Sequence, residues 1–242
     1  MNHESLLRQT EHGPFRSEEP EPPRVLLLPE LLESAPERLD PEVRQLLELF
    51  AREYPQASMI GFKLFAPEDE FDAGGYYQIA TFPDQVVPII FISEGTHDQL
   101  KPLMDIRRTS VEINARLLGI DPERMTTRLL HRFILAHEIG HVMDFLKNYR
   151  NDFEDPHEAE EEMTLHRELS KDTLPVPGLS PTDLARELSS LSSLAEAVEQ
   201  FPQLARHPLF LTLAGVEDIL RLQEKEYRAT PQERYANEFA AN

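Results

Sequence analysis

The chain has no cysteine among its 242 residues. This absence excludes disulfide bonds, thiol nucleophiles and zinc sites built from thiolates. Any zinc ion that the protein binds must therefore be held by histidine and carboxylate side chains.

Long apolar runs are also missing. No apolar run of about eighteen residues occurs, and the N-terminal sequence MNHESLLRQTEHGP has neither the cationic start nor the apolar segment of a secretory signal. We therefore expect a cytoplasmic protein that is neither inserted into a membrane nor exported.

Basic residues are scarce. The 24 lysines and arginines are outnumbered by 44 aspartates and glutamates, which gives a formal net charge of −20. Phosphate contacts need clustered Lys and Arg, so the composition argues against direct nucleic-acid binding. The acidic excess either serves solubility or attracts a basic protein partner by long-range steering, and charge alone does not separate these alternatives.

The remaining composition, with 40% hydrophobic residues, is sufficient for one domain with appended segments. Residues 1–23 are polar and rich in proline, and we interpret them as a disordered tail. Asp40 and Pro41 have the pattern of an N-cap and a first helical position, and they predict an amphipathic helix that reaches about Tyr54.

Three short strands are expected at 57–66, 76–82 and 86–93, with turn residues at 72–75 between the first two. Short connections of this kind suggest an antiparallel sheet. Pro88 in the third strand favours an edge position, because proline has no backbone N–H to donate. Such a strand either binds an extended peptide by strand addition or is an ordinary edge strand.

Helical patterns dominate the second half of the chain. A short helix is expected over 109–118, closed by Gly119, and a longer one begins after the Asp121–Pro122 pair. Apolar residues cover the longer helix widely, which is typical of a buried core helix. Further helices are expected after Ser180, with a leucine stripe that reaches Leu194, over 216–227, and from Pro231 to the end.

The strongest chemical signal in that core helix is the pentapeptide HEIGH, which runs from His137 to His141. Two histidines four positions apart lie on one helix face, so both imidazoles can reach one metal ion. Glu138 projects about 100° around the helix from His137 and can act as the base for a water molecule. Gly140 in mid-helix costs about 1 kcal/mol relative to alanine, which indicates that another element packs closely there.

A catalytic zinc ion needs a third protein ligand and an open position for water. Lys147 stands six residues after His141, where a metzincin carries its third histidine, so that arrangement is excluded. From the residues alone, the third ligand must come from another element. The candidates are His157, His166, the acids at 158–162, Glu233 and Glu238.

Two segments resemble a known family. RFILAHEIGH at 132–141 resembles the active-site helix of ImmA/IrrE-type zinc metallopeptidases, whose usual wording is close to R-F-T-L-A-H-E-L-G-H. ERYANEFAA at 233–241 resembles their second motif, E-x-E-A-N-x-F-A-A. The resemblance implies zinc ligands His137, His141 and Glu233, with Glu138 as the general base.

Two features depart from that family. His141 and Glu233 are 92 positions apart, which is longer than its usual spacing and makes 150–226 an inserted region, and Tyr235 replaces its second glutamate. Glu233 also has a structural alternative. Together with Thr230 it fits a capping box, in which its carboxylate would bond the Thr230 amide instead of a metal.

Three further residues are candidates for supporting roles. Asp144 could accept a proton from a ligand imidazole, Asn237 could assist Glu233 from the same helix face, and Tyr227 could donate a hydrogen bond to an oxyanion. The alternatives are a surface aspartate, an exposed asparagine and a packed aromatic ring.

Together these observations predict an α+β fold of the zincin type, with a small antiparallel sheet beside the HEIGH helix. The expected parts are a disordered tail at 1–23, a metallopeptidase core at 24–149, a helical insertion at 150–226 and a ligand helix at 227–242. The ligand helix reaches only about three turns before Asn242, so we expect either a truncated chain or an unusual terminus.

The expected activity is zinc-dependent hydrolysis of peptide bonds in a cytoplasmic protein. By resemblance, many family members cleave a repressor, and a basic DNA-binding substrate would suit the acidic charge of this chain. The competing interpretation is a non-catalytic acidic protein, in which the helices of 150–226 bind a partner and the metal site is structural or vestigial.

Overall fold

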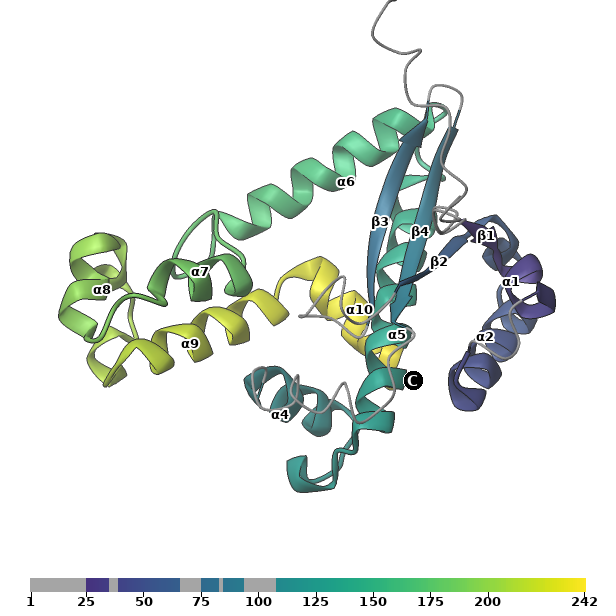
Figure 1. Cartoon of the computed structure of the whole chain (residues 1–242). Coiled ribbons are helices and arrows are strands. Elements are labelled where there is room, and N and C mark those ends of the chain that lie inside the picture. The colour runs from purple at the N-terminus through teal and green to yellow at the C-terminus, as the bar shows by residue number, and fades with distance from the viewer. Residues whose placement is uncertain (1–24, 35–38, 66–74, 83–84, 94–107) are drawn as a thin grey trace, which may run out of the picture.

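The computed structural model describes residues 25–34, 39–65, 75–82, 85–93 and 108–242. Its α+β architecture consists of a small sheet, helices packed around it and a helical arm that extends to one side (Figure 1). The expected tail at 1–23 and the turn residues 72–74 lie outside the described ranges.

Four strands form one mixed sheet in the order β1-β2-β4-β3. Their bounds are β1 Leu26–Leu27, β2 Gly61–Phe65, β3 Gly75–Phe82 and β4 Gln85–Ser93. β4 pairs antiparallel with β3, with Tyr77 opposite Ile90, and parallel with β2, with Phe62 opposite Ile90. The expectation of an antiparallel sheet is therefore wrong, because β4 lies between two strands that are consecutive in the chain.

The central position of β4 follows from its apolar residues. Ile90 and Ile92 belong to the main core, while Ile89 packs with Phe65 in a separate cluster, so β4 has buried apolar side chains in two places. A strand of this kind belongs inside the sheet, and the edge position expected from Pro88 is wrong. The proline is tolerated because pairing with β2 begins only at Ile89.

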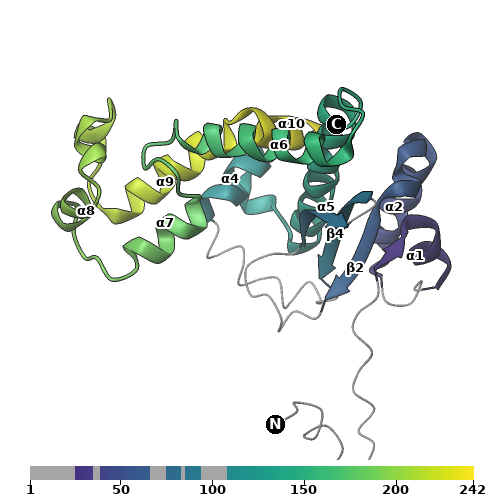
Figure 2. The same ribbon diagram turned by 90° about the horizontal axis from the view of Figure 1, so that it is seen from above.

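Two helices lie beside β2 at the end of the molecule opposite the arm (Figure 2). They are α1 Leu28–Ser34 and α2 Pro41–Glu53. α2 confirms its predicted start, since the Asp40 carboxylate accepts hydrogen bonds from the backbone N–H groups of Glu42 and Val43 at 2.9 and 3.4 Å. A 3₁₀ helix, η2 Pro55–Met59, precedes β2, so the strand begins later than the sequence indicated.

The core helix α5 runs from Thr127 to Asp144 and is buried along most of its length. Asp121 caps only a 3₁₀ turn, so α5 begins after Thr126, later than the Asp121–Pro122 pair indicated. The neighbouring elements are α4 Arg108–Leu117, the turn η3 Pro122–Arg124 and the π-helix η4 Phe145–Tyr149. Over the described ranges, no helix combines the length and apolar character needed to cross a membrane.

The helical arm comprises α6 Pro156–Lys171, α7 Pro181–Leu188, α8 Leu194–Gln200, the turns η5 Pro202–Arg206 and η6 Phe210–Thr212, and α9 Val216–Arg228. α6 leads outward and α9 leads back towards α10 Pro231–Ala241 (Figure 1). The arm has its own apolar core, which includes Leu184, Leu188 and Ile219. The leucine stripe expected on one helix is divided between α7 and α8.

Gln223 ties the turn before α7 to α9. Its side chain is fully buried, Oε1 accepts from the Val176 backbone N–H at 2.9 Å, and Nε2 donates to the carbonyls of Val176 and Leu179 at 2.9 and 2.8 Å. One side chain therefore satisfies three backbone groups of the arm.

Replacement of Gln223 by methionine keeps the side-chain volume but leaves these backbone groups without their partner. We expect the Gln223→Met variant to lose about 2–4 kcal/mol of unfolding free energy, measured by urea denaturation. Gln45→Met, at an exposed position of α2, is the matched control and should change it by less than about 0.5 kcal/mol. Equal stabilities of the two variants would show that the Gln223 bonds do not hold the arm.

Candidate metal centre

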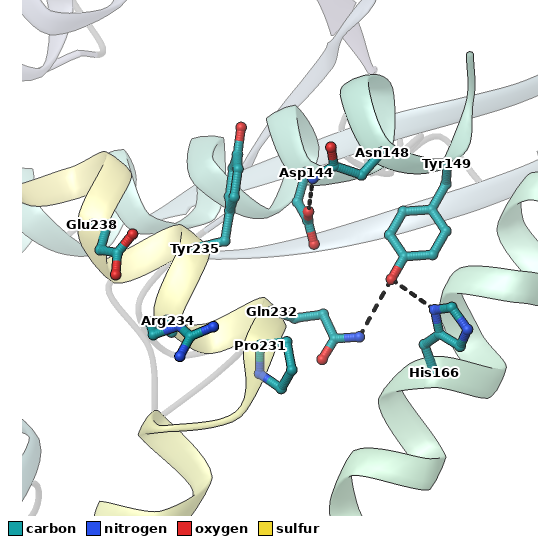
Figure 3. A pocket seen from close by; sticks show the side chains of 9 residues that line it. All are labelled: Asp144, Asn148, Tyr149, His166, Pro231, Gln232, Arg234, Tyr235 and Glu238. Carbon is teal, nitrogen blue, oxygen red and sulfur yellow. Dashed lines mark hydrogen bonds between the residues drawn. The ribbon is translucent and has the colours of Figure 1, made fainter. Parts of the chain in front are cut away.

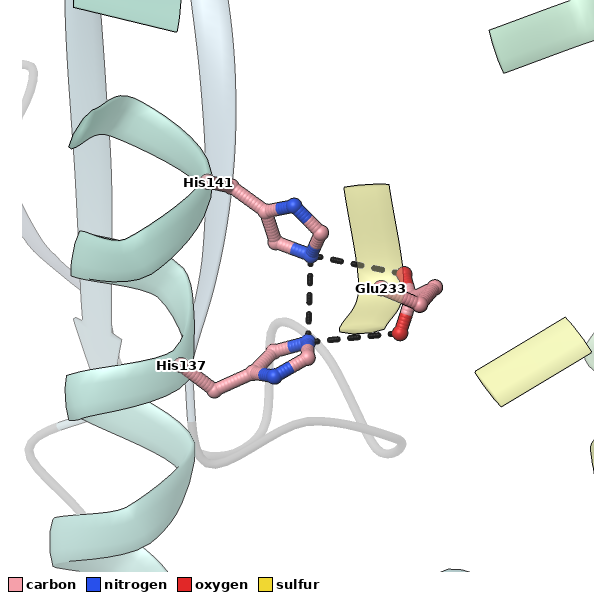
Figure 4. Close-up of side chains that lie close together, drawn as sticks. All are labelled: His137, His141 and Glu233. Atoms are coloured by element: carbon pink, nitrogen blue, oxygen red, sulfur yellow. Dashed lines mark hydrogen bonds and ion pairs between the residues drawn. The ribbon is translucent and has the colours of Figure 1, made fainter. Parts of the chain in front are cut away.

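Three predicted ligand residues meet between α5 and α10. His137 and His141 project from α5 toward Glu233 of α10 (Figure 4), and all three are at least nine-tenths buried. The two Nε2 atoms are 3.0 Å apart, while the Glu233 carboxylate oxygens lie 3.4 Å from His137 Nε2 and 3.3 Å from His141 Nε2. This group could hold a metal ion.

The three side chains come together because α5 and α10 approach each other closely at Gly140. A Cβ atom built on Gly140 would lie 2.7 Å from Ala236 Cα and 3.0 Å from the Ala236 carbonyl oxygen. Glycine is required here because no side chain fits between the two backbones. The expectation that another element packs closely on this glycine is confirmed, and that element carries Glu233 one turn before Ala236.

Glu233 does not act as a helix cap. Thr230 precedes α10 in an extended conformation, its side chain makes no capping bond, and its hydroxyl donates instead to the Tyr227 carbonyl at 2.8 Å. The capping-box alternative is therefore wrong. The Glu233 carboxylate is free of that local role and points at the two imidazoles (Figure 4).

Glu138 lies on α5 beside the first residues of β3. Its carboxylate accepts a hydrogen bond from the Tyr77 backbone N–H, and burial raises the pKa of the carboxyl group to about 7. The Glu233 charge also raises this pKa, whereas His141 and Arg228 lower it. A carboxyl group with a pKa near neutrality can both take up and release a proton.

The ligand side chains have strongly shifted proton affinities. Burial lowers the pKa of His137 to about 4, so this imidazole is neutral. Burial opposes ionisation of Glu233, but the Arg228 charge and the bonds from both histidines hold its pKa well below the ordinary value. Burial also opposes protonation of His141, yet the bond to Glu233 raises its pKa. The cluster thus consists of a stable carboxylate and imidazoles of unequal basicity.

Two tyrosines border the ligands. The Tyr77 ring stacks on His141 with a centroid distance of 4.6 Å and an interplanar angle of 24°. Tyr227, a candidate for oxyanion binding, makes a side-chain hydrogen bond with Glu233. Burial raises the pKa of Tyr77 to about 12 and that of Tyr227 well above its usual range, so both hydroxyls remain protonated donors.

The residue that the sequence did not reveal is Arg228, at the end of α9. Its Nη1 donates to Glu233 Oε2 at 2.9 Å and lies 3.3 Å from His137 Nε2. Its Nε donates to Glu224 Oε1 at 2.9 Å. An arginine in the last turn of a helix is common, so the only available signal was its position five residues before Glu233.

The other candidates do not join the cluster. Asp144 is buried, not at the surface, and its carboxylate accepts from Asn148 Nδ2 at 2.6 Å. Among the described residues His141 Nδ1 has no hydrogen-bond partner, so the expected bond from this imidazole to Asp144 is not formed. Asn237 is also buried, and within the same part of the chain its Oδ1 has no partner.

His166 supports α10 from another direction. It lines a pocket of about 360 Å³ together with Tyr149 and Gln232 (Figure 3). The Tyr149 hydroxyl lies 3.1 Å from His166 Nδ1 and 3.5 Å from Gln232 Nε2, and His166 Nε2 is 3.0 Å from Glu162. This network connects α6 to the first turn of α10, next to Glu233.

Comparison with known proteins found no match, because no family model, no curated protein and no solved structure is significantly similar to the chain. Membership of the ImmA/IrrE-type peptidases therefore remains a prediction from two short motifs.

The close contact at Gly140 gives a test of the cluster. The Gly140→Ala variant must displace α10, and with it Glu233, so we expect its affinity for Zn²⁺ to fall at least about tenfold. Overpacking costs about 1–3 kcal/mol, partly offset by the better helix propensity of alanine. Competition with a chromophoric chelator measures the affinity.

Gly215→Ala is the matched control for this substitution. Gly215 has an extended backbone, and a Cβ atom there meets nothing within 4 Å, so its zinc affinity should equal that of the wild type. If Gly140→Ala also retained wild-type affinity, the helix contact would not determine the ligand geometry.

Proposed function

We propose that this chain is a zinc-dependent metallopeptidase that hydrolyses peptide bonds of a cytoplasmic protein. The observation that carries the proposal is the convergence of Glu233 with His137 and His141, beside Glu138. Four residues of the type and arrangement used by catalytic zinc sites come from two segments that are far apart in the sequence.

The donor set and its dimensions suit zinc. Two imidazole nitrogens and one carboxylate form a common ligand set of catalytic zinc, which leaves a position for water. Tetrahedral zinc with bonds of about 2.0–2.1 Å separates its ligand atoms by about 3.3–3.4 Å. Here the two Nε2 atoms are 3.0 Å apart, and each lies at a similar distance from one oxygen of the Glu233 carboxylate, 3.4 Å to Oε2 for His137 and 3.3 Å to Oε1 for His141.

The proposed chemistry assigns a role to each residue. A zinc ion held by His137, His141 and Glu233 would polarise the scissile carbonyl and acidify a water molecule. Glu138 would take a proton from that water and deliver it to the leaving amine. The Tyr77 backbone N–H orients the Glu138 carboxylate for this transfer.

An extended polypeptide is a suitable substrate because β3 ends the sheet next to this site. β3 pairs only with β4 among the described strands, and Tyr77 contacts both His141 and Glu138. A substrate strand could add to such an edge. The net charge of −20 favours a basic protein, such as the repressors that the family resemblance suggests.

A second candidate function has one observation in its favour. Arg228 hydrogen-bonds Glu233 and contacts His137. These side chains therefore also form an ion-pair network that requires neither a metal ion nor a catalytic role. In that case the acidic helical arm would bind a partner and the metal site would be structural or vestigial. Exposed leucines such as Leu211, which is 94% exposed, would suit such a contact.

Metal analysis combined with two substitutions separates the candidates. We expect wild-type protein to bind one zinc ion and Glu138→Gln to keep it, while hydrolysis of a fluorogenic peptide library falls by about 10²–10⁴-fold. Glu233→Ala should lose the metal, whereas Glu238→Ala, exposed on the same helix, should not. Wild-type protein that takes up no zinc would refute the enzyme.

The charge of the chain predicts a salt effect on a basic substrate. Raising the ionic strength screens long-range attraction, so kcat/KM for a lysine-rich peptide should fall steadily with added salt while kcat changes little. A neutral peptide with the same cleavage site is the control and should respond weakly. Salt-independent turnover of both peptides would contradict electrostatic steering.

A further inference from the structure

Arg228 is a largely buried cation whose Nη1 group reaches two of the proposed ligand atoms. Its side chain is 15% exposed, and its Nη1 lies 2.9 Å from Glu233 Oε2 and 3.3 Å from His137 Nε2. Those two atoms are also ligand atoms of the proposed metal site. The guanidinium and a metal ion are thus directed at the same lone pairs.

His137 and Glu233 differ in whether they can bind Arg228 and a metal ion at the same time. In the tautomer with an unprotonated Nε2, the neutral His137 imidazole has a single lone pair on that atom, which either accepts from Arg228 or binds a metal. A carboxylate oxygen has further lone pairs, so Glu233 can keep the guanidinium after a metal is bound. Metal binding therefore requires Arg228 to release His137 but not Glu233.

A second carboxylate anchors the guanidinium outside the cluster. Glu224 Oε1 accepts from Arg228 Nε at 2.9 Å, and the same oxygen accepts a short hydrogen bond from the Ser110 hydroxyl of α4. Glu224 is 15% exposed. Arg228 thus has a partner that does not belong to the ligand set, and it retains this partner when it releases His137.

We propose that Arg228 is a positioning residue that holds the Glu233 carboxylate, competes with the metal ion for His137 and thereby limits the metal affinity of the centre. The inference rests on the proposed metal site, not on peptide hydrolysis. When no metal is bound, the Arg228 guanidinium supplies the positive charge that Glu233 needs and holds the Glu233 carboxylate in place. A divalent ion that enters meets a positive charge within a few ångströms, which weakens its binding.

Substitution of Arg228 tests this competition through metal affinity and stability, without any activity assay. We expect Arg228→Met to bind Zn²⁺ at least about tenfold more tightly than the wild type in a chelator competition, because the competing cation is gone. In excess chelator, the same variant should have a Tm lower by about 10 °C, since Glu233 and Glu224 lose their counter-ion.

Two further variants make the experiment decisive. Arg221→Met removes an exposed arginine from the same helix and should leave both quantities unchanged. Arg228→Lys keeps the charge but cannot bind Glu224 and Glu233 as a fork, so its zinc affinity should rise by a smaller factor. Arg228→Lys replaces Arg228→Met in the experiment if the Arg228→Met protein does not fold.

The outcomes are distinct. Tighter zinc binding by the Arg228 variants, but not by Arg221→Met, supports competition. This conclusion holds even if the wild type binds no zinc. Absence of zinc from the wild type would separately refute the proposed peptidase. Unchanged or weaker binding overturns the competition and leaves the peptidase proposal intact. Failure of the wild type and of all variants to bind zinc overturns both.

Discussion

The structure depends on one contact, the crossing of α5 and α10 at Gly140 and Ala236. A Cβ atom at Gly140 would come within 2.7 Å of the α10 backbone, so the two helices cross too closely for a side chain at this position. One turn from this crossing, Glu233 stands opposite His137 and His141. The mid-helix glycine is unfavourable for α5 alone but allows a carboxylate from the far end of the chain to reach the histidines.

That crossing creates an electrostatic problem, because it buries charged groups in one place. Glu138, Glu224 and Glu233 bring three carboxylates near a single guanidinium, and an unpaired buried charge is costly. Arg228 serves two of them, and the third, Glu138, has a pKa raised to about 7 by burial. A divalent cation would balance the remaining negative charge, which agrees with a group of side chains that could hold a metal ion.

The sequence predicted those parts that local signals determine. Asp40 marked the start of α2, Gly119 with its φ of 66° marked the end of α4, and the HEIGH spacing marked the face of α5 that carries both histidines. Strand order was not predictable in this way, because short strands carry no signal for their neighbours. The antiparallel sheet was expected from short connections, whereas the buried apolar residues of β4 determine the observed order.

The candidate site was predictable to a similar degree. The HEIGH spacing predicted that His137 and His141 share a helix face, whereas Glu233 was predicted from the resemblance of ERYANEFAA to a family motif. Arg228 was not identified, because its contacts depend on how α9 meets α10 in three dimensions. Tertiary packing likewise excludes the capping role of Glu233, although a Thr230 capping box was compatible with the local sequence.

The helical arm is more closely linked to the site than an inserted segment would need to be. α9 is one continuous helix from Val216 to Arg228, so it runs past the expected end of the insertion at 226. Its outer half packs in the core of the arm through Ile219, while its C-terminal end brings Arg228 to Glu233 and His137. The core of the arm and the guanidinium that contacts Glu233 therefore share one continuous helix.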